Sequence, residues 1–193
     1  TYENNGKTVV GTYTVTAKFT GNVDNYNLIS DMTATLLINK ATYDMSGVSF
    51  ENVTVTYDGS EHEVVLGGIL PTGVEVTYST NKGTNAGTYN AVATFTYDTA
   101  NYNVIENKTA TLTINKAKVA LPEATTSFVY NGNVQTAVSA HKLYTVVDGS
   151  KTNAGNYEAL VTLKDTVNYE WVEEFNGKVE WTIVKATHDM SGI

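Results

Sequence analysis

An internal repeat constrains this chain more than any other feature of its sequence. The segment Thr35–Ala41 (TLLINKA) returns 76 residues later as Thr111–Ala117 (TLTINKA), and more loosely as Trp181–Ala186 (WTIVKA). Self-similarity at a fixed period is typical of chains built from similar structural units, each packed against its neighbours. The sequence therefore predicts an array of modules.

Two further markers precede each copy of this segment, always in the same order. They are Gly11–Tyr13 and Asn25-Tyr26 in the first copy, Gly87–Tyr89 and Asn101-Tyr102 in the second, and Gly155–Tyr157 and Asn168-Tyr169 in the third. Because three markers keep one order and nearly one period, chance is a poor explanation for them.

The markers predict where the repeats begin and end. We expect residues 1–41 to be the C-terminal part of a repeat, 42–117 and 118–186 to be complete repeats, and 187–193 to start the next, because Thr187–Ile193 resembles Thr42–Val48. The chain would then be a window on a longer array.

Composition and charge narrow the classes of function. The 193 residues include no Cys and carry a formal net charge of −8. Without Cys there is no disulfide framework, thiolate metal site or cysteine nucleophile. The acidic balance argues against nucleic acid as a partner. No apolar stretch approaches the ~20 residues of a membrane span, so membrane insertion is not expected.

Alternating apolar and polar residues predict an all-β fold. After each Gly-x-Tyr marker every second residue is apolar, which places one side of the strand in a core. The predicted inward sets are Tyr13, Val15, Ala17 and Phe19, then Tyr89, Ala91, Ala93 and Phe95, then Tyr157, Ala159, Val161 and Leu163; the last strands contribute Ala34, Leu36 and Ile38, then Ala110, Leu112 and Ile114, then Val179, Trp181 and Ile183. About seven short strands per repeat indicate a β-sandwich.

Asp58-Gly59 lies between two predicted strands, Val53–Tyr57 and His62–Leu66. This dipeptide readily adopts the positive φ of a tight turn. We expect the two strands to form a hairpin.

The Gly-x-Tyr marker resembles the tyrosine corner of immunoglobulin-like sandwiches, in which the tyrosine hydroxyl bonds back to the main chain. The candidate residues are Tyr13, Tyr89 and Tyr157, with Gly11, Gly87 and Gly155 permitting the bend. The cysteines that flank this corner in antibody domains are missing, so packing must replace them.

Together these residues resemble the MBG repeat domains of bacterial surface proteins. The resemblance rests on Tyr57-Asp58-Gly59, Asn85–Tyr89, Asn101-Tyr102 and Thr111–Ala117, and it extends over essentially the whole chain. It implies tandem immunoglobulin-like β-sandwich repeats in secreted or cell-surface, adhesin-like proteins. The sequence departs from the pattern at Val9-Val10-Gly11, where the other repeats have Asn-Ala-Gly.

Polar residues that suggest metal sites have plainer interpretations. Glu61-His62-Glu63 alternates between the two faces of a strand, and His141 is distant in sequence. Asp98 with Asn101, and Asp165 with Asn168, offer oxygen ligands for Ca²⁺ at a module junction, but without the spacing of a calcium loop. No metal, cofactor or catalytic residue is predicted, and the chain is not expected to be an enzyme.

Two other features admit a functional interpretation. Trp171 and Tyr169 would suit stacking against a sugar ring, whereas Trp181 takes the inward place of Leu36 and Leu112 and suits a core. The recurrent Lys40, Lys116 and Lys185 end the last strand of each repeat, where an isopeptide bond to Asn is conceivable, although lysines there usually extend to solvent.

Three functions follow as alternatives. The most economical is a structural module of a bacterial stalk or filament, with neighbouring repeats or head-to-tail copies as its partners. An adhesin module would instead bind a glycan or host protein through an exposed aromatic cluster in one repeat, around Trp171. The third is polymerisation, in which a strand from another chain completes the first repeat.

Overall fold

The fold is all-β, as the alternation predicts. The computed structural model describes residues 1–188, and every regular element in that range is a β-strand. In this described part no helix is long and apolar enough to cross a membrane. Most of the predicted repeat start, 187–193, lies outside the described residues.

The chain divides into two compact units. Unit 1 comprises Thr1–Glu51, Val64–Asn81 and Asn90–Ala110, and unit 2 comprises Asn52–Glu63, Lys82–Tyr89 and the residues from Thr111 onward. The predicted repeat boundary at 41/42 falls inside unit 1, and the boundary at 117/118 falls inside unit 2. The contacts across each predicted boundary are therefore contacts within one unit.

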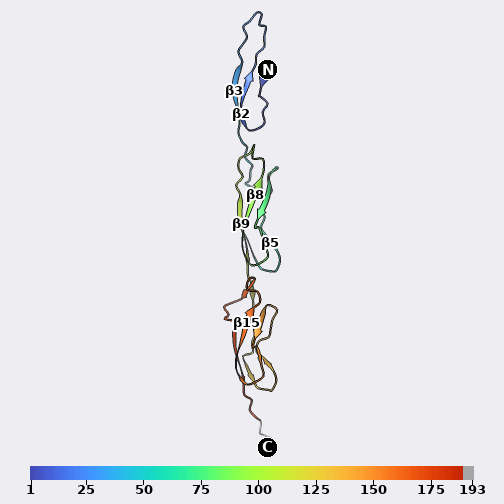
Figure 1. Ribbon diagram of the computed structural model, residues 1–193, viewed down its shortest axis with the longest axis vertical. Helices are drawn as coiled ribbons and strands as arrows, with labels where there is room; N and C mark the ends of the chain where they lie inside the picture. Colours follow the sequence, from blue (N-terminus) through green and yellow to red (C-terminus); the bar gives the residue numbers. More distant parts are fainter. Residues whose placement is uncertain (189–193) are drawn as a thin grey trace. The chain divides into compact units, whose positions relative to one another are not determined.

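Residues 1–41 form a three-stranded antiparallel sheet in the order β1-β2-β3, with β1 at Tyr2–Glu3, β2 at Gly11–Ala17 and β3 at Met32–Ile38. Strands β2 and β3 lie side by side in Figure 1. The predicted burial of Phe19 and Ala34 is wrong, because both side chains are exposed. A single layer of three strands cannot enclose its own apolar face.

The next sheet has the order β4-β9-β8-β6. Its strands are β4 (Val53–Thr56), β9 (Lys108–Asn115), β8 (Gly87–Thr96) and β6 (Glu75–Ser79). Strand β4 runs parallel to β9, whereas β6 runs antiparallel to β8. A separate short pair joins β5 (His62–Glu63) to β7 (Lys82–Gly83).

The predicted hairpin around Asp58-Gly59 is wrong. Strands β4 and β5, on either side of it, belong to different sheets and do not pair with each other. The turn chemistry is as expected: Gly59 has a φ of 87°, and the Asp58 carboxylate accepts a 2.8 Å hydrogen bond from the N–H of Ser60. The turn therefore transfers the chain from one sheet to the other.

The strands of residues 118–186 pair in the same way as those of 42–117. The order β11-β17-β15-β13 contains β11 (Ser127–Val129), β17 (Lys178–Val184), β15 (Gly155–Leu163) and β13 (Tyr144–Val147), with β11 parallel to β17. The short pair is β12 (Gln135–Thr136) with β14 (Ser150–Lys151). In addition, β10 (Ala117–Val119) runs parallel to β16 (Tyr169–Trp171).

The cores lie where the alternation predicts them in the two later segments. Ala91, Ala93 and Phe95 of β8 are buried, as are Ala159 and Val161 of β15. The last strands bury Ala110, Leu112, Ile114, Trp181 and Ile183. Since side chains alternate across a strand, one register accounts for all of these positions.

Candidate functional site: the junctions between predicted repeats

Two loops with the sequence pattern Asp-x-x-Asn-Tyr fold in the same way. In Asp98–Tyr102, one carboxylate oxygen of Asp98 accepts the N–H groups of Ala100 and Asn101, and the other accepts the side-chain amide of Asn101 at 2.8 Å. In Asp165–Tyr169, Asp165 accepts the same set from Val167 and Asn168. Each aspartate therefore holds its own loop closed.

These hydrogen bonds favour the charged form of the aspartates. The side-chain amide of Asn101 is the largest influence that lowers the pKa of Asp98, and Asn168 acts in the same way on the pKa of Asp165. Lys40 and Lys116 add smaller attractions of the same sign. The two loops are thus alike in electrostatics as well as in geometry.

The first loop, Asp98–Tyr102, forms hydrogen bonds with residues of the preceding predicted repeat. Asn101 Oδ1 accepts a 3.1 Å hydrogen bond from the N–H of Val10. Ala41 donates its N–H to the Asn101 carbonyl at 2.9 Å, and its own carbonyl accepts the N–H of Asn103. Lys40 Nζ donates to the Thr99 carbonyl at 2.7 Å. We call Val10, Lys40, Ala41, Asp98 and Asn101 the first clamp.

The second loop repeats three of these contacts. Asn168 Oδ1 accepts the N–H of Ala86 at 2.8 Å, Ala117 donates to the Asn168 carbonyl at 2.9 Å, and Lys116 Nζ donates to the Thr166 carbonyl. We call Ala86, Lys116, Ala117, Asp165 and Asn168 the second clamp. The same hydrogen bonds therefore join residues on both sides of each predicted boundary.

The second clamp is the more extensive of the two. Asn168 also donates to the side chain of Asn85 at 3.1 Å, and it is only 6% exposed. The first clamp has no such bond because Val9 replaces the asparagine. This is the departure from the repeat pattern at Val9-Val10-Gly11, and it has a structural consequence.

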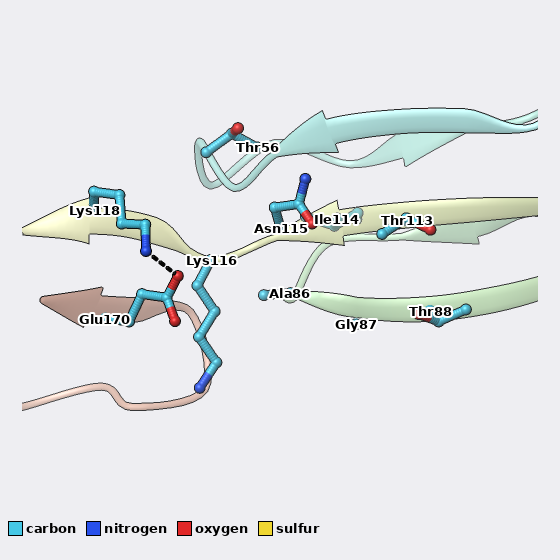
Figure 2. A pocket seen from close by; sticks show the side chains of 10 residues that line it. All are labelled: Thr56, Ala86, Gly87, Thr88, Thr113, Ile114, Asn115, Lys116, Lys118 and Glu170. Atoms are coloured by element: carbon cyan, nitrogen blue, oxygen red, sulfur yellow. Dashed lines mark ion pairs between the residues drawn. The ribbon is translucent and has the colours of Figure 1, made fainter. Parts of the chain in front are cut away.

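Pairing of strands adds to the second clamp. Figure 2 displays the Lys118–Glu170 ion pair between β10 and β16, with the side chain of Lys116 beside it. Tyr57, from the preceding predicted repeat, packs edge-on against Tyr169 at 5.4 Å between ring centroids. At the first junction the corresponding residues, Ala41 and Tyr102, form an isolated parallel bridge.

The hollow in Figure 2 has a volume of about 620 Å³ and is open to solvent. It is lined by residues of the second junction: Thr56, Ala86, Gly87, Thr88, Thr113, Ile114, Asn115, Lys116, Lys118 and Glu170. Lys116 already donates to the Thr166 carbonyl, and Glu170 already pairs with Lys118. Both side chains therefore take part in the contacts of the second junction.

The three candidate corner tyrosines make one common hydrogen bond. Tyr13, Tyr89 and Tyr157 each donate the hydroxyl to the carbonyl four residues earlier, at 2.9, 2.9 and 2.7 Å. The acceptors are Val9, Asn85 and Asn153, which directly precede Val10, Ala86 and Ala154. Tyr13 and Tyr89 therefore fix the main chain next to Val10 and Ala86, whose N–H groups donate to the clamp asparagines.

Two of the three candidate glycines, Gly11 and Gly155, make room for these rings. A Cβ at Gly11 or Gly155 would lie 3.1 or 3.0 Å from the hydroxyl oxygen of Tyr13 or Tyr157. At Tyr89 the close neighbour is Gly83, where a Cβ would lie 2.4 Å from the ring. A Cβ at Gly87 would lie 3.9 Å from that ring, an ordinary contact. Sequence reasoning missed Gly83, because Gly83 and Tyr89 meet only in the fold.

Tyr157→Phe is expected to lower the free energy of unfolding by about 1 kcal/mol, because it removes one hydrogen bond from a half-buried ring. Urea denaturation followed by circular dichroism measures this. Tyr130→Phe is the matched control, since the Tyr130 ring is exposed. Equal effects of the two substitutions would contradict a structural role for the Tyr157 hydroxyl.

The two candidate stacking residues lie in packed surroundings. Tyr169 is half-buried against Tyr57 at the second junction. Trp171 is half-buried, with its ring centroid 5.5 Å from that of Tyr144 and 5.2 Å from that of Phe175. Trp181 is 3% exposed and belongs to the core. Side chains of the protein itself thus occupy the surroundings of both candidate stacking rings.

The candidate metal ligands are engaged with other groups. Glu61 and Glu63 both pair with Lys82, and His62 Nε2 lies 3.0 Å from Asp58 Oδ1. The His141 ring packs at a tilt against Tyr144, with 4.9 Å between the ring centroids. Within residues 1–188, no three His, Cys, Asp or Glu side chains gather where they would hold a metal ion.

The recurrent lysines act through hydrogen bonds to main-chain carbonyls. Lys40 and Lys116 reach Thr99 and Thr166 in the next predicted repeat. An isopeptide bond would need the lysine nitrogen at a side-chain carbonyl of Asn or Asp. The structure therefore assigns these two lysines to the clamps.

Comparison with known proteins gives no matching family model and no matching curated protein.

Asn168→Ala is expected to lower the free energy of unfolding by about 1–3 kcal/mol, because the part-buried N–H of Ala86 and the carboxylate of Asp165 lose their partner. Asn101→Ala should cost less, since Asn101 is more exposed and lacks the bond that Asn85 provides. Urea denaturation of both variants tests this order. A larger loss for Asn101→Ala would contradict it.

Stability is expected to fall at acid pH. Because the native pKa values of Asp98 and Asp165 lie below the ordinary value of 3.8, their contribution is complete above pH 3.8 and is lost as the pH falls through the native pKa. Denaturation at a series of pH values measures the slope. Asp98→Asn with Asp165→Asn should flatten it, and an unchanged slope would contradict the assignment.

Proposed function

We propose that this chain is a non-catalytic structural segment built from tandem immunoglobulin-like modules, which forms part of an extended stalk or filament of a bacterial cell-surface protein. The supporting observation is the clamp, which recurs with the same hydrogen bonds at both predicted boundaries. A chain of modules whose neighbours are bonded to each other resists bending at the junctions. That property suits a spacer.

The strand pairings support the immunoglobulin-like part of the proposal. In both complete predicted repeats an early strand runs parallel to the last strand, which in turn lies beside the strand that carries the corner tyrosine. The tyrosine hydroxyl bonds back to the main chain in each case. These features and the sequence markers together support membership of the MBG type.

An adhesin function draws less support. An adhesin of the kind expected from sequence would present an open aromatic platform around Trp171. Tyr144 and Phe175 pack against that ring, and Tyr57 packs against Tyr169. The spacer function is therefore the one that we propose.

The test is the location and size of the native protein. Antibodies against this chain should label intact cells, and the native antigen should have a mass far above that of 193 residues. Labelling only after permeabilisation would contradict a surface location. A native mass equal to that of this chain would contradict a covalent stalk of many repeats.

A further inference from the structure

We propose that Tyr43 and Tyr102 form a site of oxidative cross-linking, at which a one-electron oxidant joins the two rings as dityrosine. The oxidant belongs to the class that a peroxidase generates from hydrogen peroxide. The product is a covalent link within one chain. This proposal goes beyond the proposed function and does not depend on it.

The two rings form a close face-to-face stack. Their centroids are 3.9 Å apart, and their planes differ by 16°. Because packed carbon atoms lie about 3.5 Å apart, this centroid distance leaves a sideways offset below about 2 Å between the rings. Each ring has two carbons next to the carbon that carries the hydroxyl. In such a stack, one of these carbons therefore lies near a counterpart on the other ring.

The main chain beside both tyrosines holds the stack in place. Ala41 and Tyr102 form a parallel bridge, and the Ala41 carbonyl accepts the N–H of Asn103 at 2.8 Å. Asn103 Nδ2 also donates to Thr42 Oγ1 at 2.9 Å. The residue directly before Tyr43 and the residue directly after Tyr102 are therefore bonded to each other, which preorganises the two rings for coupling.

Within residues 1–188, the other two tyrosine pairs in ring contact are edge-on. The planes of Tyr43 and Tyr97 meet at 79° with 6.0 Å between centroids, and those of Tyr57 and Tyr169 meet at 83° with 5.4 Å. Tyr43 and Tyr102 are half-buried, so an oxidant outside the protein can still take their electrons. Each of these two rings is the nearest coupling partner of the other.

The cross-link forms in steps that balance. Each phenol loses one electron and its hydroxyl proton, which leaves a radical shared between the oxygen and the two adjacent ring carbons. One such carbon on each ring then joins the other in a new C–C bond, and the hydrogen on each joined carbon moves to the phenolic oxygen as a proton. Hydrogen peroxide takes up the two electrons and two protons and becomes two water molecules.

The cross-link reinforces the first clamp. Tyr102 ends the clamp loop Asp98–Tyr102, and Tyr43 lies two residues after Ala41. A link between them closes a long loop of chain, which restricts the unfolded state and favours the folded one. Because the chain has no Cys, this link supplies the covalent constraint that a disulfide provides in antibody domains, and reducing agents do not cleave it.

Treatment of the purified chain with a peroxidase and hydrogen peroxide tests the proposal. Dityrosine in the monomer fraction is measured by fluorescence and, after digestion, by mass spectrometry of linked peptides that lack two hydrogen atoms. Tyr43→Phe and Tyr102→Phe keep a stacked ring but lose a phenol. Each should lower the yield at least about tenfold, because the stacked pair couples at a high effective concentration. Tyr57→Phe, from an edge-on pair, is the matched control and should leave the yield unchanged.

Two outcomes would overturn the proposal. The first is a wild-type monomer without dityrosine while a tyrosine peptide added to the same reaction couples. The second is an equal loss of yield in Tyr43→Phe and Tyr57→Phe, which would place the coupling elsewhere. The oxidised wild type should also unfold at a higher urea concentration than oxidised Tyr43→Phe, and equal midpoints would contradict the reinforcement of the first clamp.

Discussion

Trp181→Ala is expected to lower the free energy of unfolding by about 3–5 kcal/mol, the largest loss for any single substitution that we consider. The Trp181 side chain is 3% exposed and packs against Tyr157 and Phe128, with ring centroids 4.9 and 5.9 Å away. Its removal leaves a cavity that these rings cannot fill. Urea denaturation followed by circular dichroism measures the change.

Trp181→Leu is the matched control, because leucine occupies the corresponding positions 36 and 112. The indole Nε1 of Trp181 has no hydrogen-bond partner within the described residues, so leucine also removes a buried unsatisfied donor. Its loss should be clearly smaller than that of alanine. A loss below about 1 kcal/mol for Trp181→Ala would contradict a core role, since full burial of a large side chain contributes more than that.

Leu112→Ala is expected to cost about 2–5 kcal/mol, because the side chain is fully buried in β9. Leu112→Met, which nearly conserves volume, should cost less than about 1.5 kcal/mol. Strand β9 ends at Asn115, directly before Lys116 of the second clamp. The loss should therefore also affect the neighbouring predicted repeat.

Hydrogen exchange measures how far the destabilisation by Leu112→Ala extends into the neighbouring predicted repeat. If neighbouring repeats contribute to each other's stability through their interface, Leu112→Ala should speed the exchange of amides in residues 118–186. Faster exchange confined to residues 42–117 would contradict coupling through the clamp.

The register of the strands could be predicted from sequence because it depends on local alternation. Ala93, Val161 and Leu112 each stand at an apolar position of an alternating pattern. Because side chains alternate across a strand, these positions face the core, and all three are buried. The partner of each strand is a different matter. Strand β4 pairs with β9, more than 50 residues away, and nothing in the Asp58-Gly59 dipeptide distinguishes this pairing from a hairpin.

The clamps were visible in the sequence only in part. The recurrence of Asn101 and Asn168, and of Lys40 and Lys116, marked these residues as important, but oxygen-rich side chains suggested calcium and terminal lysines suggested an isopeptide bond. Their actual partners are main-chain groups of Val10, Ala86, Thr99 and Thr166. Main-chain donors and acceptors are identical at every residue, so no sequence pattern identifies them.

The most direct test of the central claim, that the clamps hold neighbouring repeats in one fixed arrangement, is a distance distribution across the second junction. Spin labels at Thr54→Cys and Thr162→Cys, both exposed and both in unit 2, report it by pulsed electron paramagnetic resonance. We expect a narrow distribution that broadens when Asn168→Ala and Lys116→Ala are added. A distribution that is equally broad with and without the clamp would contradict the claim.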